Sequence, residues 1–232
     1  MEKSVNGREI ERPQFSLKDL FKSLKKETPY GSLISDQIEN DGNKISTPYS
    51  FKTTEWLQDQ HLLQQFPEIQ KDRDYIKGRL SSSVLVDLGG GRSLMKTVAK
   101  SYGSLGYINT DLNSESDEVV DPFSKEGQEI LLNGTDEFRS VLVKMDMLDF
   151  VSRLPDNSVN FTANGIDNFI IGRGKYNNAL AKEITRTLKP GGIIFGNDMS
   201  AIEDELCELL NEVPNSFPRR VQRPYLKIFE KL

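Results

Sequence analysis

The sequence Val-Leu-Val-Asp-Leu-Gly-Gly-Gly, residues 84–91, decides the fold class of this chain. Its aliphatic residues run into a cluster of glycines, and a helical pattern follows from Leu94 to Lys100. This order is typical of a buried strand that breaks into a tight turn before a helix. Gly89 and Gly91 can adopt positive φ and carry no Cβ, so a ligand can lie directly against the backbone. The sequence therefore predicts a ligand site immediately after Leu88.

Strands alternate with helices on the C-terminal side of this stretch. The pattern predicts strands at Val84–Leu88, Gly106–Asp111, Val141–Met145, Val159–Ala163, Gly192–Asn197 and Tyr225–Phe229, the last pairing with a short strand near Arg220. It predicts helices at Leu94–Lys100, Ser124–Leu132, Tyr176–Thr187 and Ile202–Val213. Such alternation is typical of an α/β fold with a mostly parallel, Rossmann-like sheet and helices on both faces.

The N-terminal third of the chain contains helical patterns without strands. Ser16, followed by Asp19, is expected to cap a helix that runs to Lys26. Two further helices are expected, one from Thr53 or Thr54 to Gln65 and one over Glu68–Leu80. We therefore expect residues 1–80 to form a helical cap, with disordered first residues, over an α/β domain at residues 81–232.

Composition excludes several classes of protein. The chain has 232 residues and a net charge of −5, so it offers no overall attraction to phosphate backbones, and nucleic acid is a disfavoured partner. The sequence contains no apolar run long enough to span a membrane and no secretory signal, which predicts a cytoplasmic protein. His61 and Cys207 are its single histidine and cysteine, so no Cys/His metal cage is expected, and Cys207 is expected to be a buried structural thiol.

Polar residues end the successive predicted strands. Asp87, Asp111 and Asp146 follow the first three, and Asn164 follows the fourth. In parallel sheets ligands bind at the carboxyl ends of the strands, where the strand order reverses. Like charges that converge there call for a ligand with hydrogen-bond donors or positive charge. Two structural alternatives remain: Asp146 as a helix cap and Asp111 as a turn residue.

The glycine turn separates two classes of nucleotide cofactor. A nicotinamide dinucleotide carries a pyrophosphate and favours a third glycine at the position of Leu94, which breaks the G-x-G-x-x-G pattern. S-adenosylmethionine (SAM) has no phosphate and presents an ammonium, a sulfonium and ribose hydroxyls. The acidic strand ends therefore favour SAM.

Several motifs together resemble those of class I SAM-dependent methyltransferases. They are Asp-Leu-Gly-Gly-Gly at 87–91, Asp111, Met-Asp-Met at 145–147, Leu-Pro-Asp-Asn-Ser-Val at 154–159 and Leu-Lys-Pro-Gly-Gly at 188–192. The resemblance implies a seven-stranded sheet whose last strand is antiparallel. Asn-Gly-Ile-Asp at 164–167 departs from the Asn/Asp-Pro-Pro-Tyr/Phe of enzymes that methylate nucleobase or amide nitrogens, which argues against amino methylation of DNA.

The resemblance also implies roles for particular residues. Asp87, Gly89, Gly90 and Gly91 would line the methionine part of SAM, and Asp111 would hold the ribose hydroxyls beside Leu112. Asp146 and Met147 would contact the adenine, and Asn164 would approach the sulfonium. His61 is a candidate general base, with an exposed structural histidine as the alternative.

These features predict a SAM-dependent methyltransferase that acts on a small molecule. A catalytically silent SAM-binding or scaffolding protein of the same fold is the second hypothesis. An NAD-dependent oxidoreductase is the third.

Overall fold

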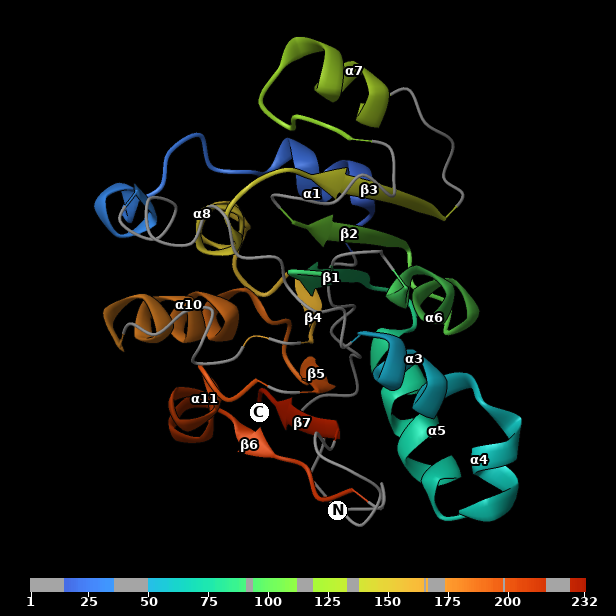
Figure 1. The fold of residues 1–232 in the computed structure, drawn as a ribbon. Helices are drawn as coiled ribbons and strands as arrows, with labels where there is room; N and C mark the ends of the chain where they lie inside the picture. The colour runs from blue at the N-terminus through green and yellow to red at the C-terminus, as the bar shows by residue number, and fades with distance from the viewer. Residues whose placement is uncertain are drawn as a thin grey trace, which may run out of the picture.

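The computed structural model of the chain describes residues 15–35, 50–90, 94–111, 119–132, 138–164, 166, 174–197, 199–215 and 226–232. Its centre is one seven-stranded sheet in the order β3-β2-β1-β4-β5-β7-β6 (Figure 1). The strands are β1 (Val84–Leu88), β2 (Gly106–Thr110), β3 (Arg139–Val143), β4 (Val159–Ala163), β5 (Ile193–Asn197), β6 (Asn211–Glu212) and β7 (Leu226–Glu230). The first five are parallel, and β7 runs antiparallel to both of its neighbours. The predicted α/β class and mostly parallel sheet are confirmed.

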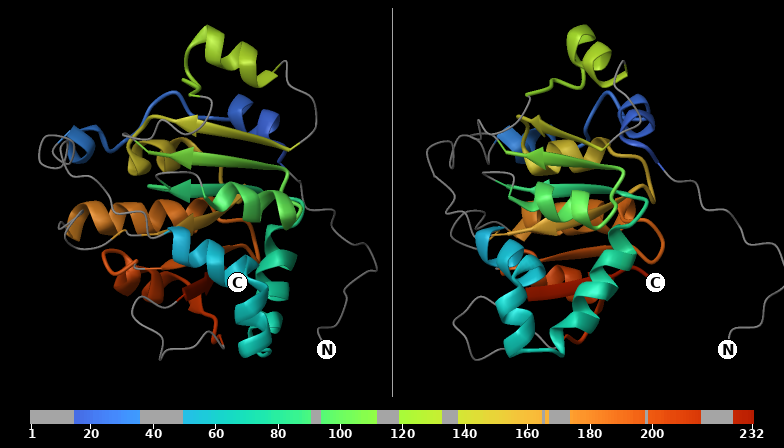
Figure 2. Two further views of the ribbon diagram at one scale, coloured as in Figure 1. Left: turned by 45° about the vertical axis from the view of Figure 1, so that its right-hand side comes forward. Right: turned by 90° about the vertical axis from the view of Figure 1, so that its right-hand side faces the viewer.

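Helices cover both faces of this sheet, as Figure 2 shows. They are α1 (Leu17–Lys22), α3 (Ser50–Gln58), α4 (Gln60–Gln65), α5 (Ile69–Leu80), α6 (Met95–Ser101), α7 (Lys125–Leu132), α8 (Met147–Arg153), α10 (Gly174–Thr187) and α11 (Glu203–Leu209). The two faces form separate cores, because successive residues of a strand point to opposite sides. Val84 and Val86 pack with α1, α8, α10 and α11, whereas Leu85 packs with α3, α5 and α6.

The N-terminal helices therefore contribute to both faces. Leu17 of α1 lies against β2, where a Cβ at Gly106 would come within 3.1 Å of it. Ile76 of α5 belongs to the opposite core, together with Leu57 of α3. The division into a cap at residues 1–80 and a domain at 81–232 stays a prediction.

Strand positions agree with the sequence predictions except at β3 and at the C-terminal edge. The strand predicted at Val141–Met145 is wrong by two residues, because parallel pairing of Gly106 with Arg139 selects Arg139–Val143. Arg139 can begin a strand because its guanidinium donates to the carbonyl of Ile130, 2.8 Å away. The partner of β7 is Asn211–Glu212, while the strand expected near Arg220 falls outside the described residues.

Three helix predictions need correction, and one observed helix was not predicted. The helix expected to start at Thr53 or Thr54 begins at Ser50 and breaks at Asp59, whose carboxylate accepts from the backbone N–H of His61 and starts α4. The helix expected over Ile202–Val213 ends at Leu209, because the next residues pair with β7. Helix α8 was not predicted.

The remaining correction concerns α1. The cap by Ser16 is confirmed, since its hydroxyl accepts from the N–H of Asp19 at 3.1 Å. The helix ends at Lys22 rather than Lys26, because the backbone N–H of Ser23 donates to Asp19 and Leu20 and closes the last turn.

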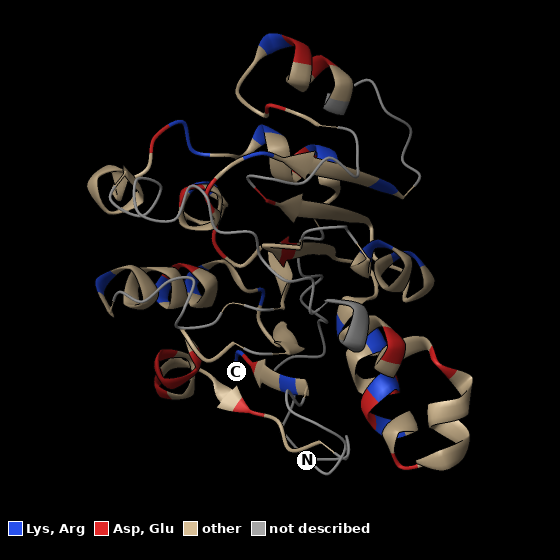
Figure 3. Cartoon of the chain, in the orientation of Figure 1, with Lys and Arg blue, Asp and Glu red and all other residues tan. Residues whose placement is uncertain are grey.

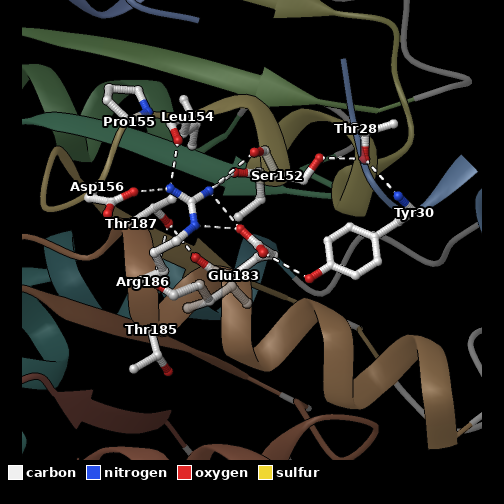
Figure 4. Close-up of polar contacts among 12 residues, drawn as sticks. Thr28, Tyr30, Ser152, Leu154, Pro155, Asp156, Glu183, Thr185, Arg186 and Thr187 are labelled. Carbon is white, nitrogen blue, oxygen red and sulfur yellow. Dashed lines mark hydrogen bonds and ion pairs between the residues drawn. The ribbon is translucent and has the colours of Figure 1, made fainter. Parts of the chain in front are cut away.

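One partly buried arginine, Arg186, ties α8 to α10 (Figure 4). The Arg186 guanidinium donates to the carbonyls of Leu154 (2.9 Å) and Ser152 (3.1 Å) at the C-terminal end of α8. Its Nε donates to Glu183, 2.6 Å away, and Glu183 accepts in turn from the hydroxyl of Tyr30 at 2.8 Å. This network satisfies carbonyls that a helix end leaves open and fastens the N-terminal segment to the domain.

We expect Arg186→Met to lower the free energy of unfolding by about 2 kcal/mol, because buried carbonyls and Glu183 lose a charged donor. Urea denaturation measures this loss. Lys182→Met is the matched control, since Lys182 is exposed on the same helix. Equal stability of the two variants would contradict a stabilising role for Arg186.

Candidate functional site

The strand order reverses between β1 and β4, which places a topological switch point at the glycine turn. Leu88 pairs with Thr110 on one side and Ala163 on the other, so Gly89, Asp111 and Asn164 lie side by side at the carboxyl edge. Pairing of Thr162 with Phe195 continues this row to Asn197 on β5. We call Asp111, Gly89, Asn164 and Asn197 the carboxyl row.

Asp87 lies under this row with its side chain fully buried. Its Oδ2 accepts from the hydroxyl of Tyr107 at 2.6 Å, and its Oδ1 has no hydrogen-bond partner among the described residues. Burial raises the pKa of Asp87 to about 7; the Tyr107 hydrogen bond opposes this rise, and the nearby charge of Asp111 adds to it. The structure therefore brings these two predicted acids together, with one carboxylate oxygen still free to accept.

The glycine turn packs closely on Asp87. Gly89 has φ +65, and its N–H donates to the carbonyl of Thr110 at 2.8 Å. A Cβ at Gly90 would lie 2.5 Å from the Asp87 carboxylate and 2.7 Å from Oδ1 of Asn109. Glycine is thus required at both positions, for different reasons. Gly91 and Leu112, also expected at the site, lie outside the described residues.

Asp146 is oriented differently from the other two acids. Its Oδ1 accepts from the N–H groups of Leu148 (2.9 Å) and Asp149 (3.1 Å) and caps α8, while Tyr176 of α10 donates to the same carboxylate at 2.9 Å. Burial raises the pKa of Asp146, and these hydrogen bonds oppose the rise. Asp146 therefore acts as a helix cap, which was the structural alternative for this residue. Met147 is the first residue of the helix that it caps, α8.

We expect Tyr176→Phe to lower the free energy of unfolding by about 1–2 kcal/mol at neutral pH, because the buried Asp146 anion loses a donor. The loss should shrink as acid protonates Asp146. Tyr102→Phe serves as control: its hydroxyl donates to the neutral carbonyl of Leu57, so its loss should not vary with pH. Denaturation curves between pH 4 and 8 compare the two variants, and a pH-independent loss in both would contradict this role.

The β4 and β5 end of the carboxyl row is covered by α3. Oδ1 of Asn164 accepts from the hydroxyl of Thr53 at 2.5 Å and from the backbone N–H of Asn197 at 3.1 Å. Thr53 and Asn197 are both fully buried. The approach of the strands requires Gly196, where a Cβ would lie 1.7 Å from the carbonyl oxygen of Ala163.

Sequence reasoning named Asn164 but missed its two partners. Asn197 was available to it, because the strand predicted at Gly192–Asn197 ends at the same edge as the predicted acids. Nothing in the local sequence around Thr53 indicated a functional role; it indicated only the start of a helix. Its contact exists only because α3 packs across the strand ends.

Two other sequence candidates lie away from this row. His61 is exposed in the first turn of α4, and α4 lies away from the strand ends in Figure 1. Cys207 was predicted to be buried but is exposed, because the apolar side of α11 is formed by Leu206. Partial burial and neighbouring acids, Glu212 and Glu203, raise the pKa of the Cys207 thiol, which opposes nucleophilic reactivity.

Charge is distributed unevenly over the described surface. The first turn of α11 carries Glu203, Asp204 and Glu205, and α11 stands out as an acidic helix in Figure 3. Among the described residues, no group of three or more His, Cys, Asp and Glu side chains is arranged to hold a metal ion. No helix in the described part of the chain is both long and apolar enough to cross a membrane.

Comparisons by sequence found neither a matching protein-family model nor a matching characterised protein. Comparison by structure found methyltransferases. The N-methyltransferase NodS from Bradyrhizobium japonicum WM9 is 11% identical over 75% of this chain and 99% of its own, with a TM-score of 0.49. An rRNA methylase from Streptococcus thermophilus is 13% identical over 71% and 96%, with a TM-score of 0.45.

A third similar structure is geranyl diphosphate methyltransferase in complex with SAM, 13% identical over 70% of this chain and 85% of its own, with a TM-score of 0.41. The seven-stranded sheet of this chain, with its antiparallel β7, is the arrangement that the resemblance predicted. The strand order and the antiparallel β7 show that the chain has a Rossmann-like α/β fold.

Proposed function

We propose that this protein is a methyltransferase that uses SAM to methylate a small molecule. The observation that carries this proposal is the proximity of two acids beside the glycine turn at the switch point: Asp87 pairs with Asn109, two residues before Asp111, and the charge of Asp111 raises the pKa of Asp87. Two converging acids at a ligand edge fit a ligand that brings positive charge and hydrogen-bond donors.

The residues present fit SAM better than a dinucleotide. The acidic pair would repel a pyrophosphate but attract an ammonium or a sulfonium, and the free Oδ1 of Asp87 can accept from such a donor. Asp111, about 20 residues beyond the glycine turn, is placed where an acid commonly binds ribose hydroxyls. Gly90 leaves no side chain between the turn and the acids.

Each site residue then has a proposed part in binding. Asp87 and the glycine turn, including Gly89, Gly90 and Gly91, would hold the methionine part. Asp111 and Leu112 would hold the ribose and flank the adenine. Asp146 and Met147 would border the adenine, with the second carboxylate oxygen of Asp146 as the acceptor, and Asn164 would lie nearest the reacting end.

The chemistry supplied by bound SAM is a methyl group on a sulfonium, open to in-line displacement by an acceptor. The chain mainly has to align the two reactants and exclude water, and positioning of this kind is worth up to roughly 7–11 kcal/mol. Burial of Asn164 and Asn197 beneath α3, which contributes the buried Thr53, supplies such a dry edge. We propose this covering function for the helical cap at residues 1–80.

A small-molecule acceptor is favoured over nucleic acid by the charge of the chain. The net charge is −5, and acids line the proposed cofactor edge. A polyanion approaching this edge would be repelled.

Isothermal titration calorimetry with SAM and with its demethylated product, S-adenosylhomocysteine (SAH), tests cofactor binding. We expect both to bind and NADH to give no heat. Methyl transfer from labelled SAM to a metabolite mixture then tests catalysis. Binding without transfer would favour the scaffolding hypothesis, and absence of SAM and SAH binding would reject the proposed function.

A further inference from the structure

The amide of Asn197 is buried without hydrogen bonds. Its side chain is fully buried, and neither Oδ1 nor Nδ2 has a hydrogen-bond partner among the described residues. Buried polar groups are nearly always paired, and an apolar side chain of the same shape would suit an unpaired position better. An asparagine whose donor and acceptor are both unfilled is therefore suited to a partner that is supplied from outside the chain.

The place of Asn197 in the fold connects it to the reacting end of the proposed cofactor site. If Asp111 on β2 holds the ribose, the adenosine lies toward β2 and β3, and the methyl group points toward β4 and β5. Asn197 ends β5 and lies beside Asn164, to which its backbone N–H donates at 3.1 Å. We propose that Asn197 binds the methyl acceptor; this inference rests on the proposed function.

The chemistry of the amide defines the class of acceptor. Asparagine offers an acceptor oxygen next to N–H donors, so its complement carries a donor next to an acceptor. Carboxamides have this pattern, and so does the edge of a heterocycle with an amino group beside a ring nitrogen, which asparagine binds in a bidentate manner. The acidic pair Asp87 and Asp111 disfavours an anion at the neighbouring strands. The acceptor is thus a neutral molecule with a carboxamide or an equivalent heterocyclic edge.

Access to Asn197 requires movement of α3. The N-terminal half of α3 is held by the bond from Thr53 to Asn164 and by a contact of 3.4 Å from the Thr54 hydroxyl to the sulfur of Met95. The C-terminal half is anchored more firmly, because Arg73 donates to the carbonyl of Trp56 at 2.8 Å and Tyr102 donates to Leu57 at 2.9 Å. Withdrawal of the N-terminal half would open the amide while the helix stays attached.

Four small probes test this assignment on the SAH-loaded full chain by NMR titration. Benzamide and 2-aminopyridine carry the required pair, benzoate is an anion with acceptors only, and toluene has neither. We expect benzamide or 2-aminopyridine to bind, and the stronger of the two tells a carboxamide from a heterocyclic acceptor. Benzoate and toluene should bind at least about tenfold more weakly.

Asn197→Leu and Asn177→Leu form a matched pair of variants. Asn177 is also a buried asparagine with an unpaired Oδ1, but it lies on α10. We expect Asn197→Leu to keep SAH binding and its melting temperature while losing at least about tenfold in benzamide or 2-aminopyridine affinity. Asn177→Leu should keep all three properties. Thr53→Val should bind the same probes more tightly, because α3 is then released more easily.

Two results would overturn the assignment. One is equal probe affinity in the wild type and Asn197→Leu; the other is SAH binding without any preference for benzamide or 2-aminopyridine. A clear loss of melting temperature in Asn197→Leu would show that the amide serves the fold instead. If SAH itself does not bind, the proposed function fails first, and this inference fails with it.

Discussion

Replacing Asp111 with alanine is expected to weaken SAM binding by about 10- to 100-fold. Hydrogen bonds to a charged group contribute about 1.5–3 kcal/mol, and 1.4 kcal/mol corresponds to a factor of ten in affinity. The free energy of unfolding should change by less than about 1 kcal/mol, because the variant also removes the repulsion between Asp111 and Asp87. Calorimetric titration with SAM, paired with urea denaturation, measures both quantities.

The control for this variant is Asp204→Ala. Asp204 is exposed in the first turn of α11 and contributes the same charge to the chain. It should leave SAM affinity unchanged, which separates a local contact from an effect of net charge. Unchanged affinity in Asp111→Ala would place the ribose elsewhere and remove the basis of the site assignment.

The second large effect concerns the dependence of stability on pH. Burial raises the pKa of Asp87 from its ordinary value of 3.8 to about 7. The folded protein therefore holds this proton more tightly than the unfolded chain does, so Asp87 contributes less stability as pH rises from about 4 to 7. A tenfold change in proton affinity corresponds to about 1.4 kcal/mol, so the full effect is at most about 4 kcal/mol.

Asp87→Asn should remove this dependence. Near pH 3, where Asp87 is largely protonated in both the folded and the unfolded protein, the wild type and the variant should have similar free energies of unfolding. At pH 8 the variant should be the more stable, by up to about 4 kcal/mol. Urea denaturation across this range gives the difference curve. Parallel curves for the wild type and Asp87→Asn would show that Asp87 does not titrate with a raised pKa, while Asp204→Asn should stay parallel to the wild type throughout.

Local sequence patterns predicted an element correctly where the intrinsic propensity of its residues and their expected burial favoured the same secondary structure. Val84–Leu88 and Val159–Ala163 were predicted with the observed bounds, because each is a short segment between turn residues that is rich in β-branched, aliphatic or aromatic residues. The Ser16 cap was also predictable, since a serine followed by an acid three residues later satisfies the first N–H groups of a helix without help from elsewhere.

Predictions failed where pairing or packing chose between local alternatives. The residues after Leu209 are compatible with either a helix or a strand. They form β6 because Asn211 and Glu212 pair with the open edge of β7. Asp146 was weighed as a helix cap, but α8 itself was not predicted, because it is short and Tyr176 of α10 supports its first turn through Asp146. Cys207 was predicted to be buried because apolar residues lie near it in the sequence. It is exposed because the buried ones among those residues lie on another face of the helix.

The sequence alone determined the α/β class, the glycine turn and the presence of acids at the strand ends, because these depend on residue type and on periodicity within short segments. Only the tertiary structure decided which acids meet. The register of β1 and β2 pairs Asp87 with Asn109 and so brings Asp111, two residues later, near Asp87, while Asp146 caps α8 and accepts from Tyr176. Only the tertiary structure joined Thr53, Asn164 and Asn197, because contacts between distant segments depend on how helices and strands pack, which local sequence does not encode.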